Sequence, residues 1–232
     1  MTADVPASVV AAIQPEPSLR EQVAMWLRNA LFIGDLPPGS TFSVPALAQQ
    51  FGVSATPVRE AVLDLVQQGL VVAVPSKGFL VVDPSVDVIR QTVEIRALLE
   101  IPTTCRIAES VSATEVLPMR QMADVILEHA QNRDLRGFVE IDYQFHRQVT
   151  GLCGNPMLTE LIEELRSRTR VHTVPYLAQQ NLLLESAQQH HQLLDAMLAR
   201  DLDKVATVTR QHMGYAVAGE RWAHDDEQSS SN

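Results

Sequence analysis

The sequence has only two cysteines in 232 residues and no long apolar run. Cys105 and Cys153 lack CxxC spacing, which argues against a disulfide framework or a zinc–thiolate knuckle, and both are expected to be buried free thiols. No uninterrupted apolar run approaches the roughly 18 residues of a membrane span. The amino terminus also lacks the basic region and cleavage site of a secretory signal. A cytoplasmic protein is therefore expected.

Basic residues are scarce as well. The chain holds 18 Lys and Arg against 28 Asp and Glu, and its formal net charge is -10. Phosphate neutralisation by cations supplies most nonspecific affinity for nucleic acids, so this balance argues against general nucleic-acid coating. A selective binder that doubles its contacts as a dimer remains compatible with it. The apolar fraction of 46% favours a mainly α-helical globular protein with two domains.

The amino-terminal third has the signals of three helices. Ser18 and Glu21 form a capping box that begins a helix, and that helix should run to Gly34. Ser43 is expected to cap a short second helix. A third helix is expected to start at Thr56 as its cap, with Pro57 in the first helical position, and to end before Gly69.

The period of the apolar residues then changes from 3.6 to 2. Residues 70–74 and 79–82 are rich in β-branched side chains and flank a turn at 75–78, which predicts a two-stranded hairpin. Helix, helix, turn, helix and hairpin is the order of a winged helix-turn-helix. We therefore expect residues 18–83 to form a DNA-binding domain whose third helix enters the major groove.

From Pro84 onward long amphipathic patterns follow one another with short connections. They predict an antiparallel bundle of six or seven helices over residues 84–223, in which Pro102 kinks or splits the first helix. Residues 1–17 and 224–232 are polar or Pro-punctuated and are expected to be flexible. The expected helices span 86–110, 115–131, 135–152, 157–176, 181–200 and 202–222.

The groove-facing helix carries one arginine suited to reading bases. A guanidinium can bond both acceptors of guanine, which makes Arg59 the main candidate, although it could instead pair with Asp64 or Glu60 at the surface. Gly78 at the hairpin tip also has a structural alternative, because tight turns favour glycine. The further candidates for contact with DNA are Ser43, Ser54, Thr56, Lys77 and Gly78.

The bundle carries a possible metal site. Asp142 and His146 are four residues apart and share a helix face, although such a pair is often only a surface pair. His190 and His212 lie on the apolar sides of two other helices, so three helices could converge on one divalent cation. One carboxylate and three imidazoles suit zinc first, with nickel, manganese and iron as alternatives.

A bound metal of charge +2 beside one aspartate leaves positive charge inside the bundle. We therefore expect the site to attract a small carboxylate. Arg96, on the first bundle helix, is a candidate anchor for that carboxylate through a bidentate fork. The alternative for Arg96 is an ion pair with Glu100, four residues on.

The amino-terminal motifs resemble a known family. FGVSATPVREAVLDLVQQGLVV, with GDLPPGSTFSVPALAQQ before it and PSKGFLVV after it, is similar to the DNA-binding domain of GntR-superfamily bacterial transcription regulators. The resemblance covers nearly all of residues 18–83. Ala55 stands where that family usually has an arginine implicated in DNA contact, which leaves more of the base reading to Arg59.

The resemblance extends into the bundle. DYQFHRQV, GNPML, HHQLLDAM and RQHM are similar to the metal-containing ligand domain (FCD) of the FadR-type branch. Aligning HHQLLDAM on that pattern selects His190, whereas a one-residue offset would select His191. Asn155 matches the pattern too, although a helix cap explains it equally. His129, His172 and His224 match nothing and are expected at the surface.

The resemblance implies a homodimeric regulator that binds small organic acids in its bundle. We therefore expect a ligand-responsive repressor that binds a palindromic operator, with a divalent metal and a small carboxylate effector. Two alternatives remain at this stage. One is a metal-dependent enzyme acting on small organic acids, against which no HExxH motif or nucleophile elbow is present. The other is a DNA-binding protein with an inert bundle.

Overall fold

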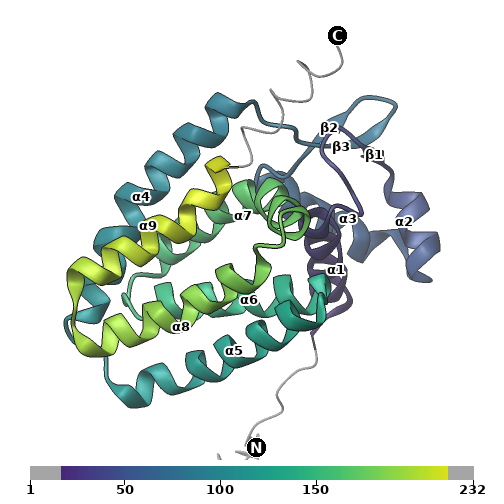
Figure 1. Cartoon of the computed structure of the whole chain (residues 1–232). Coiled ribbons are helices and arrows are strands. Elements are labelled where there is room, and N and C mark those ends of the chain that lie inside the picture. The colour runs from purple at the N-terminus through teal and green to yellow at the C-terminus, as the bar shows by residue number, and fades with distance from the viewer. Residues whose placement is uncertain (1–16, 219–232) are drawn as a thin grey trace, which may run out of the picture.

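The computed structural model describes residues 17–218 and places a small winged module against a helical bundle (Figure 1). The expected tails at 1–17 and 224–232, the end of the last expected helix and His224 fall wholly or mostly outside the described residues. No helix in the described part of the chain is long and apolar enough to cross a membrane. The elements are α1 (Leu19–Ile33), β1 (Thr41–Phe42), α2 (Val44–Phe51), α3 (Ala55–Gln67), β2 (Val71–Val74), β3 (Gly78–Val81), α4 (Val86–Ala108), α5 (Ala113–Asn132), α6 (Leu135–Gly151), α7 (Pro156–Gln179), α8 (Leu183–Ala199) and α9 (Leu202–Ala218).

Local capping explains where the first helices begin. Ser18 accepts a hydrogen bond from the amide of Glu21, whose side chain returns to the cap, and α1 ends at Gly34 with φ +89°. Ser43 caps α2 by accepting from the amide of Ala46 at 3.4 Å. Both capping predictions are confirmed.

The start of α3 differs from the prediction. Ser54 is the cap residue, so the helix begins at Ala55, two residues earlier than a Thr56 cap would place it. Pro57 is consequently the third helical residue. Its missing amide hydrogen still costs nothing, because the first-turn amides of a helix have no partner inside the helix.

The winged module contains one strand more than expected. The sheet order is β1-β3-β2, with both pairs antiparallel. The short β1 pairs Thr41 with Leu80 and Phe42 with Phe79. A two-residue strand carries no periodic pattern that a sequence could reveal, which is why only the hairpin was predicted.

The bundle consists of α4 to α9, in agreement with the lower of the two predicted helix numbers for the part of the chain that the structure describes. Helix α4 runs through Pro102 as one element of 23 residues, so of the two predicted effects, a kink or a split, the split does not occur. A capping box also begins α5, since Ser112 accepts from the amide of Glu115 and the Glu115 side chain returns to the cap amide.

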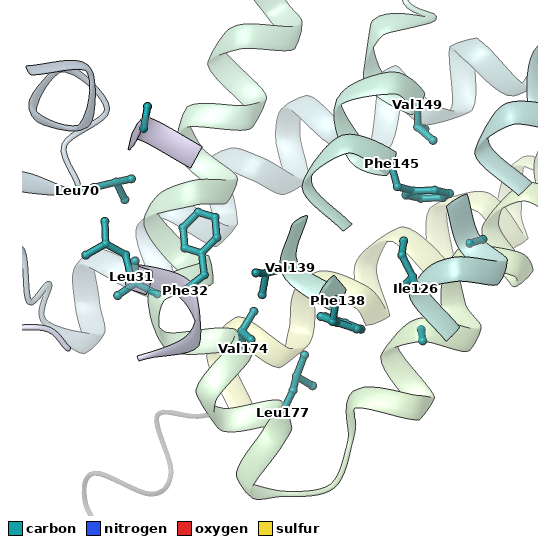
Figure 2. Packing of buried hydrophobic residues seen from close by; sticks show 14 of the residues in the cluster. Leu31, Phe32, Leu70, Ile126, Phe138, Val139, Phe145, Val149, Val174 and Leu177 are labelled. Carbon is teal, nitrogen blue, oxygen red and sulfur yellow. The ribbon is translucent and has the colours of Figure 1, made fainter. Parts of the chain in front are cut away.

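The hydrophobic core joins the two parts of the molecule. Leu31 and Phe32 of α1 are fully buried and belong to one continuous cluster with Val139 and Val174 of the bundle (Figure 2). Because α1 packs on both α6 and α7, the winged module is anchored to the helices that carry the candidate site. A change of bundle packing can therefore reach the DNA-binding elements through direct contact.

Candidate metal centre and nucleic-acid interface

Four side chains from three helices meet inside the bundle. Asp142 and His146 lie on α6, His190 on α8 and His212 on α9, and their ligand atoms all lie within 4.8 Å of one another. Asp142, His146 and His190 are buried and His212 is half-buried. The structure thus brings together the four residues that the sequence singled out.

The spacing of the ligand atoms suits a cation. His146 Nε2 lies 3.1 Å from the Nε2 atoms of both His190 and His212. Asp142 Oδ1 lies 3.3 Å from His146 Nε2 and 3.1 Å from His190 Nε2. Ligands about 2.1 Å from one metal are separated by roughly 3.0 Å in an octahedral and 3.4 Å in a tetrahedral arrangement, so these distances match a shared ion.

The hydrogen bonds behind the imidazoles also fit a metal. His190 Nδ1 lies 3.1 Å from the Ala187 carbonyl, and His212 Nδ1 lies 3.0 Å from Gln189 Oε1. Because these oxygens only accept, both Nδ1 atoms carry the proton and both Nε2 atoms turn lone pairs toward the centre. Lone pairs that face one another are satisfied by a cation. The donor set therefore fits a divalent metal.

The electrostatics keep the site ready for such an ion. Burial holds the pKa of His146 and His212 well below the ordinary value, with nearby positive groups adding to the effect, so both imidazoles are neutral. Burial raises the pKa of Asp142, but the Arg170 guanidinium at 2.8 Å and the contacts with His146 and His190 together outweigh it, and the net pKa lies well below the usual range. Neutral imidazoles and an ionised carboxylate are the forms that bind metal.

His191 lies outside this cluster and contacts Asp124 at 3.3 Å. His129 pairs with Asp134 at 2.9 Å. The expectation of surface positions is only partly right, because His129 and His172 are half-buried. Cys105 and Cys153 are free thiols and are half-buried rather than buried.

Arg96 makes the ion pair that was its alternative. Its Nε donates to Glu100 at 2.7 Å and its Nη1 to Thr169 at 2.8 Å, and both Arg96 and Glu100 are buried. Arg96 also lines a cavity of about 40 Å³ beside the metal cluster. Arg96 thus lies at the predicted site, but two nitrogens of its guanidinium already donate to Glu100 and Thr169.

Two further arginines were missed by the sequence reasoning. Arg166 and Arg170 of α7 are buried and line the same cavity. Arg166 pairs with Glu100 at 2.5 Å, and Arg170 pairs with Asp142. Their spacing of four, next to the buried Ile162 and Leu165, was the available signal: charged residues at inward positions of a helix indicate a buried ionic site.

Glu100 is the negative centre of this arginine network, and its removal is predicted to destabilise the fold. Arg166 and Arg96 hold its pKa at about 2 against the opposing effect of burial. A folded pKa below the usual 4.5 means that this stabilisation is present above pH 4.5 and is lost as the pH falls toward 2. Glu100→Gln should therefore lose about 3 kcal/mol of unfolding free energy at pH 7. The deficit should vanish near pH 2 in urea titrations, and an equal deficit at both pH values would contradict this reasoning.

Four of the six predicted DNA-binding residues are exposed on the winged module. Ser54, Thr56 and Arg59 are exposed, and Ala55 is the first residue of α3. Within the described residues Arg59 has no hydrogen bond or ion pair, while Asp64 pairs with Arg20 at 2.6 Å. The guanidinium of Arg59 is thus available to an outside partner.

The remaining candidates for contact with DNA differ in whether their side chains are free to bind it. Lys77 is exposed at the hairpin tip. Gly78 has φ +91°, and an added Cβ would collide with the Phe42 carbonyl, so the turn itself requires glycine there. Ser43 is half-buried and its hydroxyl caps α2. Asn155 likewise caps α7 by accepting from the Leu158 amide.

Comparison with known proteins agrees with both parts of the molecule. The family profile described as "Bacterial regulatory proteins, gntR family" matches residues 19–81, and that of the FCD domain matches residues 91–215. The chain is 27% identical over 186 residues to the HTH-type transcriptional regulator McbR of Escherichia coli, covering 79% of this chain and 84% of that protein. It is 25% identical over 209 residues to the HTH-type transcriptional repressor RspR of Escherichia coli, covering 89% and 90%.

Solved structures show the same architecture. The structure of Escherichia coli McbR/YncC aligns with a TM-score of 0.74 at 26% identity, covering 87% of this chain and 96% of that one. A putative GntR regulator from Rhodococcus aligns with a TM-score of 0.69 at 21% identity, covering 86% and 95%, which supports the fold. With a winged helix-turn-helix and an FCD domain in one chain, the protein belongs to the GntR family of bacterial transcription regulators and not to a class of enzymes.

Proposed function

We propose that the protein is a cytoplasmic, ligand-responsive repressor whose bundle binds a divalent metal and a small carboxylate effector. The observation that carries the proposal is the convergence of Asp142, His146, His190 and His212 on one point, beside buried arginines. Zinc is the first choice for the metal, with nickel, manganese or iron as alternatives. A metal held by Asp142, His146, His190 and His212 would supply positive charge that attracts a carboxylate. The Arg96, Arg166 and Arg170 guanidiniums orient the carboxylate.

DNA reading is assigned to Arg59, supported by Ser54, Thr56 and Lys77. Arg59 is exposed and free of partners among the described residues, on the helix that this fold offers to the major groove. Because Ala55 cannot bond to bases or phosphates through its side chain, the operator is expected to differ from that of relatives with arginine there. Ser43 and Gly78 could contact DNA only through their backbone amides. The Ser43 hydroxyl caps α2, and the turn geometry explains the glycine at position 78.

Helix α7 provides a route from the effector to the DNA. Arg166 and Arg170 face the metal cluster, and between them Arg168 faces the winged module. Arg168 Nε donates to the Gln68 carbonyl at 3.2 Å, at the carboxyl end of the DNA-reading helix α3. A carboxylate that draws Arg166 and Arg170 toward the metal would shift α7, and with it the end of α3. Effector and DNA binding are then coupled, reciprocally, by about 1 to 3 kcal/mol.

The active species is proposed to be a homodimer on a palindromic site. Helix α4 lies at the edge of the bundle (Figure 1) and exposes Val88, Ile95 and Leu98 by 48, 47 and 70%. Their spacing of seven and three places them on one helix face. A second copy of the same face would bury these side chains and bring two α3 helices to one operator.

Leu98→Asp is expected to convert this dimer into monomers. A charge in the middle of an apolar interface costs several kcal/mol of association free energy, because it must be desolvated. Light scattering after size-exclusion chromatography measures the mass of each variant. Met157→Asp is the matched control, since Met157 is 81% exposed and belongs to α7 rather than α4. A Leu98→Asp protein that stays dimeric would exclude this interface.

The function is tested by titrating the protein onto the intergenic DNA next to its own gene, with and without small carboxylates and with and without a chelator. A carboxylate that changes operator affinity only while metal is bound supports the proposal. Operator binding that is indifferent to every acid and to the chelator would instead favour an inert bundle.

A further inference from the structure

The metal cluster has a small cavity on each of two sides. The arginine-side cavity, of about 40 Å³, is the one proposed to hold the effector carboxylate. The threonine-side cavity, of about 20 Å³, is lined by Thr104, Thr150 and Thr209 among others. Both cavities share His146, Arg166 and His212, so a molecule at the metal can extend into either one.

The two cavities have opposite hydrogen-bonding character. Arg96, Arg166 and Arg170 line the arginine-side cavity with Asp142 as the one carboxylate among its lining residues, so that side offers donors. The threonine-side cavity also touches Arg166, but its wall includes Glu100 and three threonine hydroxyls. That side offers mainly acceptors.

The threonine hydroxyls act as acceptors because two of their protons are already used. Thr104 Oγ1 donates to the Glu100 carbonyl, and Thr150 Oγ1 donates to the His146 carbonyl at 2.9 Å. Each hydroxyl has one proton and two lone pairs, so only lone pairs remain for a ligand. An anionic group in this cavity would meet those lone pairs and would receive no hydrogen bond from Thr104 or Thr150.

Thr209 adds an unused group. It is 7% exposed, and its Oγ1 has no hydrogen-bond partner among the described residues. A buried hydroxyl without a hydrogen-bond partner destabilises the protein by about 1 to 3 kcal/mol. A ligand group that bonds to this hydroxyl would therefore bind more tightly, by part of that free energy. Because Thr209 lines the threonine-side cavity, its hydroxyl is placed to serve a group that enters there.

We propose that the threonine-side cavity is a subsite for one hydroxyl of the effector, which makes the effector a short hydroxy acid rather than an unsubstituted or dicarboxylic acid. The inference rests on the proposed function, since it requires a carboxylate at the metal. A hydroxyl donates to the lone pairs of the threonines and accepts from Thr209. A volume of about 20 Å³ admits a single water-sized group. An ammonium group fits less well, because Arg166 and the metal would repel it.

The test compares acids that differ only in this group. Calorimetric titration of the zinc-loaded, full-length protein would use butyrate, its 2-, 3- and 4-hydroxy derivatives, and succinate. We expect the 3- or 4-hydroxybutyrate to bind about 3- to 10-fold more tightly than butyrate, as one added hydrogen bond predicts. Succinate should bind more weakly than that hydroxy acid.

Thr209→Val supplies the decisive variant, because it removes the hydroxyl and keeps the shape. The ratio of hydroxybutyrate to butyrate affinity should fall toward 1, because the hydrogen bond from Thr209 is lost while the acceptors Thr104 and Thr150 remain. Thr207→Val is the matched control: Thr207 is exposed on the same helix, where its Oγ1 donates to the Asp203 carbonyl at 2.8 Å. The ratio should be unchanged in that control.

Three results would overturn the subsite. The first is equal affinity for butyrate and all its hydroxy derivatives, which means that the cavity holds only water. The second is succinate as the tightest ligand. The third is a hydroxyl gain that is undiminished in Thr209→Val, which assigns the gain to chelation of the metal. Zinc binding without affinity for any of these acids would remove the carboxylate effector itself, and the subsite with it.

Discussion

Replacing Arg59 by alanine is expected to weaken binding to the operator by roughly 30-fold or more. A bidentate guanidinium contact to guanine contributes about 1 to 3 kcal/mol, and a dimer on a palindrome loses two such contacts. Few other cations of the winged module can compensate, since only Arg20, Arg28, Arg59 and Lys77 occur up to residue 82. Arg20 among them is already paired with Asp64. Fluorescence anisotropy with labelled operator DNA measures the loss.

Arg210→Ala is the matched control for this substitution. Arg210 is exposed on α9, within the bundle and outside the winged module, so its removal changes the net charge equally without touching the proposed interface. Arg59→Lys should recover only part of the affinity, because an ammonium cannot form the planar fork. If Arg59→Ala and Arg210→Ala bind operator equally, Arg59 is a solvated surface charge and base reading must lie elsewhere.

Replacing His146 by alanine is expected to abolish both metal retention and the response to carboxylates. The Nε2 atom of His146 lies within 3.3 Å of ligand atoms of Asp142, His190 and His212, so it occupies the middle of the cluster. Substitutions that only disturb residues behind metal ligands cost about 10- to 100-fold in affinity, and loss of a ligand should cost at least as much. Inductively coupled plasma mass spectrometry of the purified variant measures the metal content.

His191→Ala controls for the loss of an imidazole. His191 is adjacent to a cluster residue in sequence but contacts Asp124 outside the cluster. The His191→Ala variant should retain metal. Its operator binding should respond to carboxylates in the same way as that of the parent protein. Operator binding itself should survive in His146→Ala, because Arg59 lies on a different module. A His146→Ala protein that keeps its metal and its effector response would remove this site from the mechanism.

The helices of both parts of the molecule could be predicted well because their signals are local and strong. Capping boxes at Ser18 and Ser112 and long stripes at helical spacing determine where helices begin and which faces are buried. The convergence of Asp142, His146, His190 and His212 was also predicted, since each lies on the apolar side of its helix. The choice between His190 and His191 needed the structure, because a one-residue offset turns a helix by about 100°.

The errors in the prediction have physical causes. Strand β1 exists only because β3 offers it partners, and a two-residue pairing leaves no trace in composition. Pro102 does not divide α4, because packing of a 23-residue helix outweighs the loss of one backbone hydrogen bond. The inward positions of Arg166 and Arg170 on their helix indicate a buried ionic site, but only the fold shows that they pair with Glu100 and Asp142. The partners in long-range ion pairs of this kind have no sequence signature.

The central claim is that one metal ion joins α6, α8 and α9 at the site of effector control. Anomalous diffraction from crystals of the protein, recorded above and below the zinc edge and the edges of the alternative metals, tests it most directly. We expect one strong peak per chain, bonded to Asp142, His146, His190 and His212. Crystals with metal elsewhere, or zinc-soaked crystals with no peak among these four side chains, would contradict it.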